Sequence, residues 1–392
     1  MSWETVRLEK LYSTESRNGL TKPSKVRGAG YKMINMGELF SNDRIFDISM
    51  ELVPLSENEK LTAKVEKGDL LFARQSLVLE GAGKCSIVME ASDLTVFESH
   101  LIRVRLDRKK ADPLFYYYYF RSPFSPIKTI VSQCAQAGIR GSDLQRLDVV
   151  CPSLEIQHRI ASILSAYDDL IENNRKQIKL LEEAAQRLYK EWFVDLRFPG
   201  YENTPIFDGL PEGWKRKKLV DIAYIQYGFA FDGTLFNSER RGTPILRIRN
   251  IPEGATNDYT TETADNQYLV HNGDIVVGMD GEFHINTWSG DVAYLVQRTC
   301  HIEPHDPKVK GWLLYAIYEP IKFFEKTVIG ATVAHLGKKH IDTINLLCGT
   351  EDLYKPFQAL FEKRQALLNQ NRKLSEARDR LLPKLMSGEM EL

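Results

Sequence analysis

The chain has 392 residues, of which 43% are hydrophobic and 27% are charged, and its formal net charge is −1. This length favours two or three domains over one, and the near-zero charge excludes the overall basic character of many nucleic-acid-binding domains. No hydrophobic run approaches the ~20 residues of a membrane-spanning helix, and the charged start "MSWETVRLEK" lacks the apolar segment of a signal peptide. We therefore expect a cytoplasmic protein without a membrane partner.

The front of the chain predicts a mixed α/β domain. "DLLFA", "CSIVM" and the alternating "LIRVRL" are typical of strands, and "PLFYYYYFRS" predicts a short helix. Its tyrosines, Tyr116 to Tyr119, form either a base-stacking surface or part of a core. Because an aromatic run within a helix is more often buried, we expect core.

A long helix follows this first domain. Pro152 and Ser153 form a start signal, and Glu155 suits the first helical turn. Apolar residues then recur at spacings of four and three from Ile160 to Trp192, which is typical of a coiled-coil seam. The segment "RFPGYENTPIFDGLPEGW" is rich in Pro and Gly and predicts a linker after the helix.

The second part of the chain has the same order of elements. "DIVVGM" and "VAYLV" predict strands, "GWLLYAIYEP" predicts a short helix, and a second long seam runs from Phe357 to Leu385. Pro383 is expected to end or kink this helix because proline lacks the backbone N–H.

The two halves are related by an internal repeat. "NRKQIKLLEEAAQRL" from Asn174 and "NRKLSEARDRLLPKL" from Asn371 lie 197 positions apart, as do Leu144 and Ile341 and the cysteines at 151 and 348. Further forward, "KGDLLFAR" matches "NGDIVVGM", Trp3 matches Trp214, and "YKMINM" at Tyr31 is aligned with "LRIRNI" at Leu246. The chain is therefore predicted to be a duplicated unit whose loops have diverged.

The long helices are expected to pair with each other. Both seams place an asparagine near the middle, and a polar seam residue specifies register at some cost in stability. The alternative is that each helix closes its own domain, with Asn on a solvated edge. A helix of forty residues is ~60 Å long and suits a spacer. The residues expected to pair the helices are Ile160, Tyr167, Ile171, Asn174, Ile178, Leu181, Leu188, Leu360, Leu367, Asn371, Leu374 and Leu381.

No catalytic or metal-binding constellation stands out. The five cysteines, which include Cys85, Cys134 and Cys300, are scattered and form no C-x-x-C pair, so we expect buried thiols rather than disulfides or zinc ligands. "EGAGKCS" lacks the first glycine and the hydroxyl of a phosphate loop. "HIEPH" and "GKKH" offer no third ligand at metal spacing. We therefore predict no catalytic residue, no metal site and no cofactor in this chain.

Basic, amide and aromatic side chains occur in matching loops of both halves. Residues 1–150 carry 22 Lys and Arg against 19 Asp and Glu, and residues 199–350 carry 15 against 19, so any cationic face must be local. Arg pairs with guanine, Gln or Asn with adenine and acids with cytosine, whereas Lys and Ser suit phosphates. The alternative is that these are solvated loops of an inert domain. The candidate DNA-binding residues are Arg17, Lys22, Lys25, Arg27, Arg74, Gln75, Ser76, Lys84, Tyr227, Phe231, Arg241, Arg247, Asn250, Asp280, His284, Lys338 and Lys339.

Taken together, these motifs resemble the specificity subunit of type I restriction-modification systems over essentially the whole chain. The resemblance is carried by "LPEGW", "GYKMIN", "PILRIRNI", "GDLLFAR", "GDIVVGMDG", the segment from "PSLEIQHRI" to "DLRFPG", and "RDRLLPKLMSGEMEL". It implies an α+β fold with two similar target-recognition domains in tandem, each followed by a long helix, and the two helices pairing as an antiparallel coiled coil. The implied segments are domain 1 (1–151), helix 1 (152–196), linker and domain 2 (197–349), and helix 2 (350–392).

The resemblance also implies a non-catalytic function. Each domain would read one half of a bipartite, asymmetric site in double-stranded DNA, and the helices would set the spacer. Two modification subunits, which bind S-adenosylmethionine and methylate adenine N6, would dock on this scaffold, and restriction subunits would complete the nuclease. Two alternatives remain open: a recognition subunit of a methyltransferase-only system, and a coiled-coil scaffold that binds proteins. An enzymatic activity of this chain alone has the least support.

Overall fold

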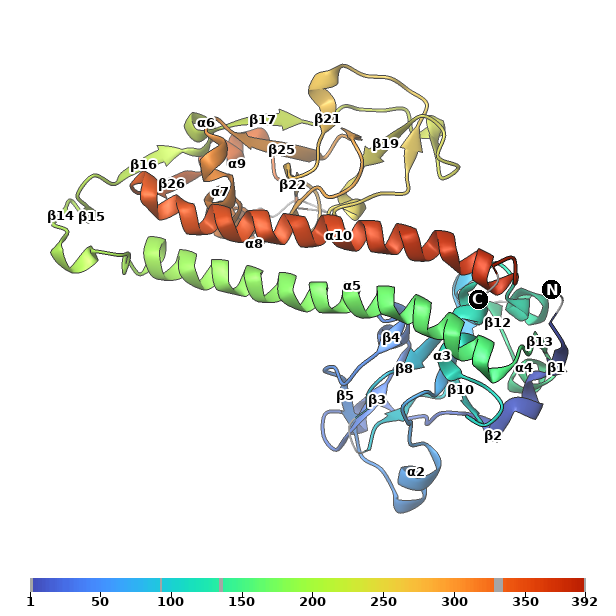
Figure 1. Ribbon diagram of the computed structural model, residues 1–392. Coiled ribbons are helices and arrows are strands. Elements are labelled where there is room, and N and C mark those ends of the chain that lie inside the picture. Colours follow the sequence, from blue (N-terminus) through green and yellow to red (C-terminus); the bar gives the residue numbers. More distant parts are fainter. Residues whose placement is uncertain (1–2, 92–93, 134–136, 328–333, 391–392) are drawn as a thin grey trace. The chain divides into compact units, whose positions relative to one another are not determined.

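The computed structural model describes residues 3–91, 94–133, 137–327 and 334–390 (Figure 1). The chain forms two compact units. The first comprises Met1–Asp169 and Ser375–Leu392, and the second comprises Leu170–Leu374. The helices α5 (Leu154–Tyr189) and α10 (Lys355–Met386) therefore each contribute to both units. None of the helices within the described residues is long and apolar enough to cross a membrane.

The first unit contains a main sheet in the order β2-β10-β6-β8-β4 and a small sheet in the order β5-β3-β9. Two further short pairings join β1 to β13 and β11 to β12 and β7. Its strands are β1 (Thr5–Arg7), β2 (Tyr12–Asn18), β3 (Tyr31–Ile34), β4 (Arg44–Ile45), β5 (Glu51–Val53), β6 (Leu70–Ala73), β7 (Gln75–Ser76), β8 (Cys85–Val88), β9 (Val96–Phe97), β10 (Leu101–Leu106), β11 (Ser132–Gln133), β12 (Ala137–Gly138) and β13 (Asp148–Val150). Its shorter helices are α1 (Met36–Ser41), α2 (Glu57–Thr62), α3 (Pro113–Arg121) and α4 (Gly141–Gln145).

Helix α3 forms the core of the first unit. Pro113 occupies its first turn and the Asp112 carboxylate accepts the Leu114 N–H, which fixes the start of the helix. All four tyrosines from Tyr116 to Tyr119 are at most 3% exposed. The expectation that this aromatic run is core and not a stacking surface is therefore confirmed.

The second unit contains a main sheet in the order β17-β25-β22-β23 and a second sheet in the order β18-β20-β19-β24-β21. The remaining strands form the pairs β14 with β15 and β16 with β26. Its strands are β14 (Ile206–Phe207), β15 (Leu210–Pro211), β16 (Lys215–Lys218), β17 (Ala223–Tyr227), β18 (Phe236–Asn237), β19 (Thr243–Leu246), β20 (Tyr259–Thr260), β21 (Leu269–Val270), β22 (Ile275–Gly278), β23 (Ile285–Thr287), β24 (Ala293–Leu295), β25 (Thr299–Pro304) and β26 (Asn345–Cys348). Its shorter helices are α6 (Leu219–Ile222), α7 (Lys310–Ala316), α8 (Tyr318–Thr327) and α9 (Lys338–Ile341).

The duplication is visible in the strand pairing. The order β2-β10-β6-β8 corresponds to β17-β25-β22-β23, and both units contain a matching parallel pair, β3 with β9 and β19 with β24. Gly19 and Gly228 occupy the same place: a Cβ on either would lie 2.0 or 2.1 Å from the carbonyl oxygen of Phe97 or Val296. Only glycine allows this close approach of two backbones. The segments "NGLTK" (18–22) and "YGFAF" (227–231) therefore correspond at their glycines.

One alignment made from the sequence is wrong. Ile34 pairs with Phe97 in β9 and Leu246 pairs with Leu295 in β24, so Tyr31 corresponds to Thr243 and not to Leu246. The residues after Leu246 form a turn in which the Asn250 side chain accepts the Arg247 N–H. A short apolar pattern of period two can be shifted without losing its apparent match.

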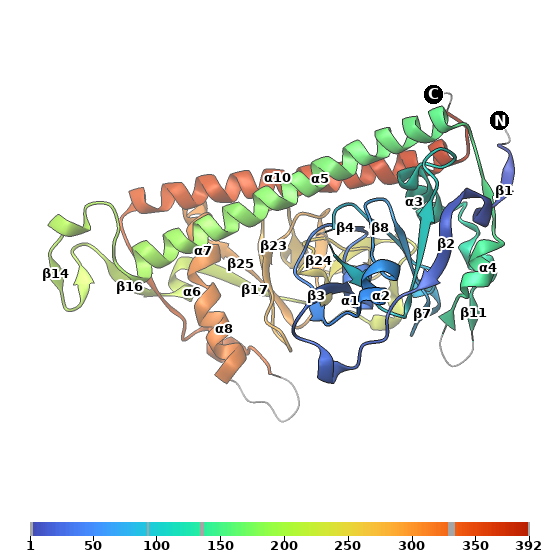
Figure 2. The same cartoon turned by 90° about the horizontal axis from the view of Figure 1, so that it is seen from below.

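The two long helices pair in antiparallel fashion within each unit (Figure 2). In the second unit, Asn174 Nδ2 donates to Asn371 Oδ1 (2.9 Å), and Arg364 pairs with Glu182 (2.6 Å) further along. In the first unit, the Asp168 carboxylate accepts from Arg378 (2.5 Å) and from the Tyr118 hydroxyl (2.6 Å). Polar contacts therefore occur at intervals along a mainly hydrophobic seam.

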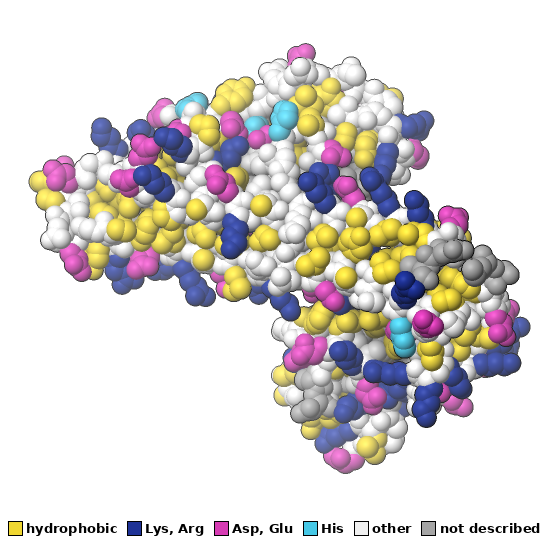
Figure 3. Space-filling model, viewed as in Figure 1, with side chains coloured by type: hydrophobic (Ala, Val, Ile, Leu, Met, Phe, Trp, Pro, Cys, Tyr) yellow, Lys and Arg dark blue, Asp and Glu magenta, His cyan; other side chains and the backbone are white. Residues whose placement is uncertain are grey.

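The seam residues differ in burial. Ile160, Ile171, Asn174 and Ile178 are buried, whereas the other residues expected to pair the helices are partly exposed. Hydrophobic side chains also reach the surface of the helices (Figure 3). Among them, Leu170 and Leu180 of α5 are 48% and 63% exposed.

The ends of both long helices depart from simple expectation. α5 passes into one π-helical turn, Lys190–Val194, before the linker. α10 does not end at Pro383 but continues to Met386, where the Ser387 N–H bonds the Pro383 carbonyl. A proline removes one N–H bond from a helix, and the packing of Leu385 and Met386 into the first core holds the last turn.

Candidate nucleic-acid interface

Several predicted DNA-binding residues of the first unit are tied to neighbouring loops. Lys22 pairs with Glu59 (2.8 Å), Arg27 with Glu51 (2.6 Å) and Lys84 with Asp43 (3.2 Å). Arg17 donates to the Thr62 carbonyl (2.6 Å), whereas Lys25 is exposed. Such pairs order the loops before any ligand arrives, although each exposed pair contributes little to stability.

A second group surrounds the end of strand β6. The Arg74 N–H bonds the His100 carbonyl, and Gln75 in β7 pairs with Gly138 in β12. Within the described residues, the Arg74 guanidinium has no hydrogen-bond or ion-pair partner. Ser76 Oγ accepts the Val78 N–H and so shapes the following loop. Arg74 and Gln75 are thus displayed from a rigid strand end.

The candidates around β17 and β19 in the second unit have mixed environments. Phe231 is 6% exposed and packs on Tyr294, so its ring supports the loop rather than facing solvent. Tyr227 is partly buried, Arg241 pairs with Glu239 (3.1 Å), and the Arg247 guanidinium lies over the Phe236 ring.

The remaining candidates lie near the ends of β22 and β25. The Asp280 carboxylate contacts His335 Nδ1 (2.5 Å) and lies 3.4 Å from Arg298 Nε. His284 lies 3.6 Å from Glu282, and Lys338 and Lys339 are exposed on α9. Sequence reasoning missed Arg298 and His335. Arg298 stands between Gln297 and Thr299 in a short strand connection, and His335 is a lone polar residue between Ala334 and Leu336, so neither belongs to a recognisable motif.

Sequence reasoning also missed a basic strand. All four residues of β16, Lys215–Lys218, are exposed, and they form no ion pair within the described part of the chain. The matching stretch before Leu8 reads Glu-Thr-Val-Arg, so the concentration of charge is specific to the second unit. The run "KRKK" is the signal that could have identified it.

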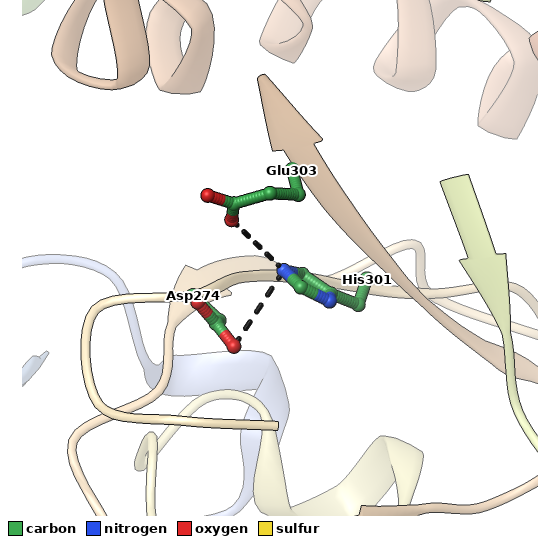
Figure 4. Close-up of side chains that lie close together, drawn as sticks. All are labelled: Asp274, His301 and Glu303. Carbon is green, nitrogen blue, oxygen red and sulfur yellow. Dashed lines mark hydrogen bonds and ion pairs between the residues drawn. The ribbon is translucent and has the colours of Figure 1, made fainter. Parts of the chain in front are cut away.

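One cluster has the composition of a metal site: Asp274, His301 and Glu303 (Figure 4). Lys310 Nζ lies 2.9 Å from Glu303 and 3.5 Å from Asp274, so an ammonium already supplies positive charge. Asp274 Oδ2 also accepts the His271 N–H, as Asp69 Oδ2 accepts the Glu66 N–H in the first unit. The shared feature is therefore a buried aspartate that closes the turn before a strand, which is a structural role.

The two buried cysteines have environments of low reactivity. Cys85 and Cys300 are buried, and burial raises the pKa of the Cys300 thiol to about 12. Cys151 and Cys348 are partly buried, and Cys134 lies outside the described residues. A thiol with a raised pKa stays protonated and is a poor nucleophile.

The molecule contains two duplicated α+β modules built on an antiparallel helix pair. They display different polar residues at equivalent loop ends, which is the architecture of a tandem recognition protein. The family model "Type I restriction modification DNA specificity domain" matches residues 1–183. The MjaIX specificity subunit of Methanocaldococcus jannaschii is 27% identical over 367 residues, which cover 87% of this chain and 84% of that protein. The EcoBI specificity subunit of Escherichia coli is 33% identical over 135 residues, 34% of this chain and 28% of its own length.

The fold has a solved counterpart. The S subunit of a type I restriction-modification system from M. genitalium superposes with a TM-score of 0.57 at 17% identity, covering 98% of this chain and 96% of that one. Residues 1–183 thus match the DNA specificity domain of type I restriction-modification systems, and the similarity to a curated specificity subunit extends over most of the chain. In such a system this subunit is non-catalytic, and the enzymatic activities belong to its partner subunits.

Proposed function

We propose that each unit of this chain reads one half of a bipartite, asymmetric site in double-stranded DNA. The observation that carries this proposal is the exchange of side chains at shared backbone positions: Arg74 and Gln75 follow β6 where Met279 and Asp280 follow β22. The backbone positions are kept and the hydrogen-bonding groups differ. Two domains that recognise different DNA sequences need a shared backbone with different hydrogen-bonding side chains, because base edges are distinguished by their pattern of donors and acceptors.

The proposed exchangeable domains are residues 1–151 and 197–349. The test is to replace residues 1–151 with the corresponding domain of another specificity subunit, to co-express the chimera with its modification subunits, and to map methylated adenines by single-molecule sequencing. One half-site should change, while the other half-site and the spacer stay the same. A change in both half-sites would contradict independent reading.

The helices are proposed to act as a spacer between the two readings. One heptad inserted in each helix where the two units meet in sequence, after Asp169 and after Leu374, preserves the seam and lengthens the pair by ~10 Å. That length corresponds to about three base pairs at roughly 3.4 Å each. The unread spacer should lengthen accordingly in the methylation map, and an unchanged spacer would overturn the idea.

The partners are proposed to be two modification subunits, which supply S-adenosylmethionine and adenine-N6 methylation, and restriction subunits in the full complex. The exposed Leu170 and Leu180 offer hydrophobic surface on α5 for docking. Double substitution of these leucines by Ser should weaken co-purification of the modification subunit.

A methyltransferase-only system is the alternative within DNA recognition. It predicts the same methylation map without sequence-dependent cleavage, and the neighbouring genes distinguish the two. A coiled-coil scaffold for unrelated proteins predicts that the purified complex protects no specific DNA sequence.

A further inference from the structure

Arg298 lies between β24 and β25 in a backbone conformation that few non-glycine residues adopt. Its φ is +67°, and such a residue typically costs about 1 kcal/mol or more unless its surroundings hold it. Here the Arg298 carbonyl accepts the Met279 N–H, and the next N–H group on the N-terminal side, that of Gln297, bonds the Phe229 carbonyl. A glycine would fit more easily, so the position retains a side chain at a cost.

The Arg298 side chain lies against two neighbours, Asp280 and His335. Asp280 Oδ2 lies 3.4 Å from its Nε, and the His335 ring lies 3.3 Å from its Nη1. Asp280 is in turn fixed by His335 Nδ1 at 2.5 Å. The Arg298 side chain is 55% exposed, so it remains accessible to a ligand from solvent.

A second Arg–Asp pair in the same unit shows the contrast. Arg249 binds Asp258 through both Nε and Nη2, at 3.1 and 2.6 Å, and so its bidentate edge is occupied. The closest contact of Arg298 with the Asp280 carboxylate is made by Nε, and its Nη1 lies 3.3 Å from the His335 ring. The aspartate therefore orients the guanidinium without a hydrogen bond to its terminal nitrogens.

The same backbone site exists in the first unit with other side chains. The Arg74 N–H bonds the His100 carbonyl as the Met279 N–H bonds that of Arg298, so His100 and Arg298 correspond. Gln75 pairs with Gly138 as Asp280 forms a bridge to His335. The first unit therefore has His100 where the second has Arg298, and it has Gln75 where the second has Asp280.

We propose that Arg298 reads a guanine in the second half-site, with Asp280 and His335 as positioning residues that orient its guanidinium. An arginine whose fork faces the major groove bonds guanine O6 and N7 together, which adenine cannot accept in the same way. In the first unit Gln75, which corresponds to Asp280, carries the group that pairs with adenine. This inference rests on the proposed DNA-reading function, since it names the base and the residue.

The experiment uses the full chain co-purified with its modification subunits and a duplex carrying the methylated site. Dissociation constants are measured for this duplex and for a set in which each base pair of both half-sites is changed singly. For Arg298→Ala we expect roughly 10- to 100-fold weaker binding of the cognate duplex. Binding of the duplex already changed at one G·C pair of the second half-site should stay the same, and discrimination in the first half-site should be intact.

Further variants separate recognition from folding and from charge. Arg298→Gly suits the positive φ and should keep or raise the melting temperature while losing the same discrimination. Arg298→Lys keeps the charge and should still lose most of it. Asp280→Asn should reduce discrimination at that same pair by less than Arg298→Ala. The matched control, Arg249→Ala, should leave discrimination unchanged.

Two outcomes would overturn the assignment. If Arg298→Ala weakens all duplexes equally, the residue contacts phosphate and not a base; if it changes nothing, the cluster is only a surface ion pair. Failure of the proposed function looks different, because the unsubstituted complex would then show no base dependence in the second half-site.

Discussion

The two units solve one structural problem in two ways. Each begins a central strand with a buried aspartate that caps the preceding turn, Asp69 in the first unit and Asp274 in the second. Arg105 neutralises Asp69 with two bonds of 2.7 and 2.8 Å, whereas His301 and Lys310 surround Asp274. The aspartate is demanded by the backbone of the turn, but any cation of suitable reach can balance it. After the duplication, the aspartate that the backbone of the turn requires is therefore the same in both units, whereas the cationic side chains around it differ.

The largest expected effect is loss of either core, and it tests whether the units are independently stabilised. Phe115 and Trp312 are at most 1% exposed, each in the core of its own unit. Substitution by Ala should cost about 3–5 kcal/mol because buried aromatic volume is lost. Hydrogen exchange should show the loss confined to the substituted unit. Phe323→Ala, at a 60% exposed position, is the control and should cost under about 0.5 kcal/mol.

Asp168 should be the most sensitive polar position of the helix pair in the first unit. It is 7% exposed and accepts from Tyr118 and Arg378; burial and this carboxylate together raise the pKa of the Tyr118 hydroxyl. Asp168→Asn should cost about 2–3 kcal/mol in urea unfolding, because a partly buried guanidinium loses its counter-ion. Asp379→Asn is the matched control: it also contacts Arg378 but is 62% exposed and should cost under about 1 kcal/mol. Equal losses would contradict the importance of burial.

The neutral Asn pair of the second unit should behave differently. Asn174→Leu leaves the Asn371 amide without its partner and should cost about 1 kcal/mol. The double variant with Asn371→Leu should regain that stability or exceed it, since an apolar seam pair is more stabilising than a polar one. If the double variant is the least stable, the amide pair contributes more than register. Size-exclusion chromatography should also reveal any change in helix pairing.

The basic strand β16 distinguishes the second unit electrostatically. Replacing Lys215, Arg216, Lys217 and Lys218 by Gln should leave folding intact because all four are exposed. If they face phosphates, the slope of log K against log salt becomes shallower by about 0.9 for each phosphate that is no longer neutralised. Base discrimination should not change. Lys308→Gln, an exposed lysine already paired with Glu351, is the control and should leave the slope unaltered.

The smallest effect concerns acid stability. Burial raises the pKa of the Glu303 carboxyl, but bonds from His301 and Lys310 outweigh burial and hold that pKa below its ordinary value. A carboxyl with a depressed folded pKa stabilises above its unfolded pKa of about 4.3, and this stability is lost as pH falls through the folded value. Glu303→Gln should therefore flatten the decline of the second unit's melting temperature below about pH 4.5. A decline identical to that of the unsubstituted chain would refute the assignment.

Local patterns predicted much of the architecture. The spacing of apolar residues in α5 and α10, the matched Asn174 and Asn371, and the shared "GD" turns depend on residues close in sequence, and the structure contains each of them. The predicted register of Tyr31 is wrong, and α10 continues past Pro383, where the sequence predicts an end or a kink. The strand register and the end of α10 both depend on strands or side chains that are distant in sequence. A rule based on alternating apolar residues or on the missing N–H of proline does not include such contacts.

The sequence by itself determined the duplication, the two long helices and the resemblance to a known family, because these follow from periodicity and repeated motifs along the chain. Only the tertiary structure decided which polar loop residues are already paired and which remain exposed to solvent. Lys22 and Arg27 order their own loops through ion pairs with Glu59 and Glu51. Asp280, Arg298 and His335, far apart in sequence, meet because three strand and loop ends converge, and no local pattern records that convergence.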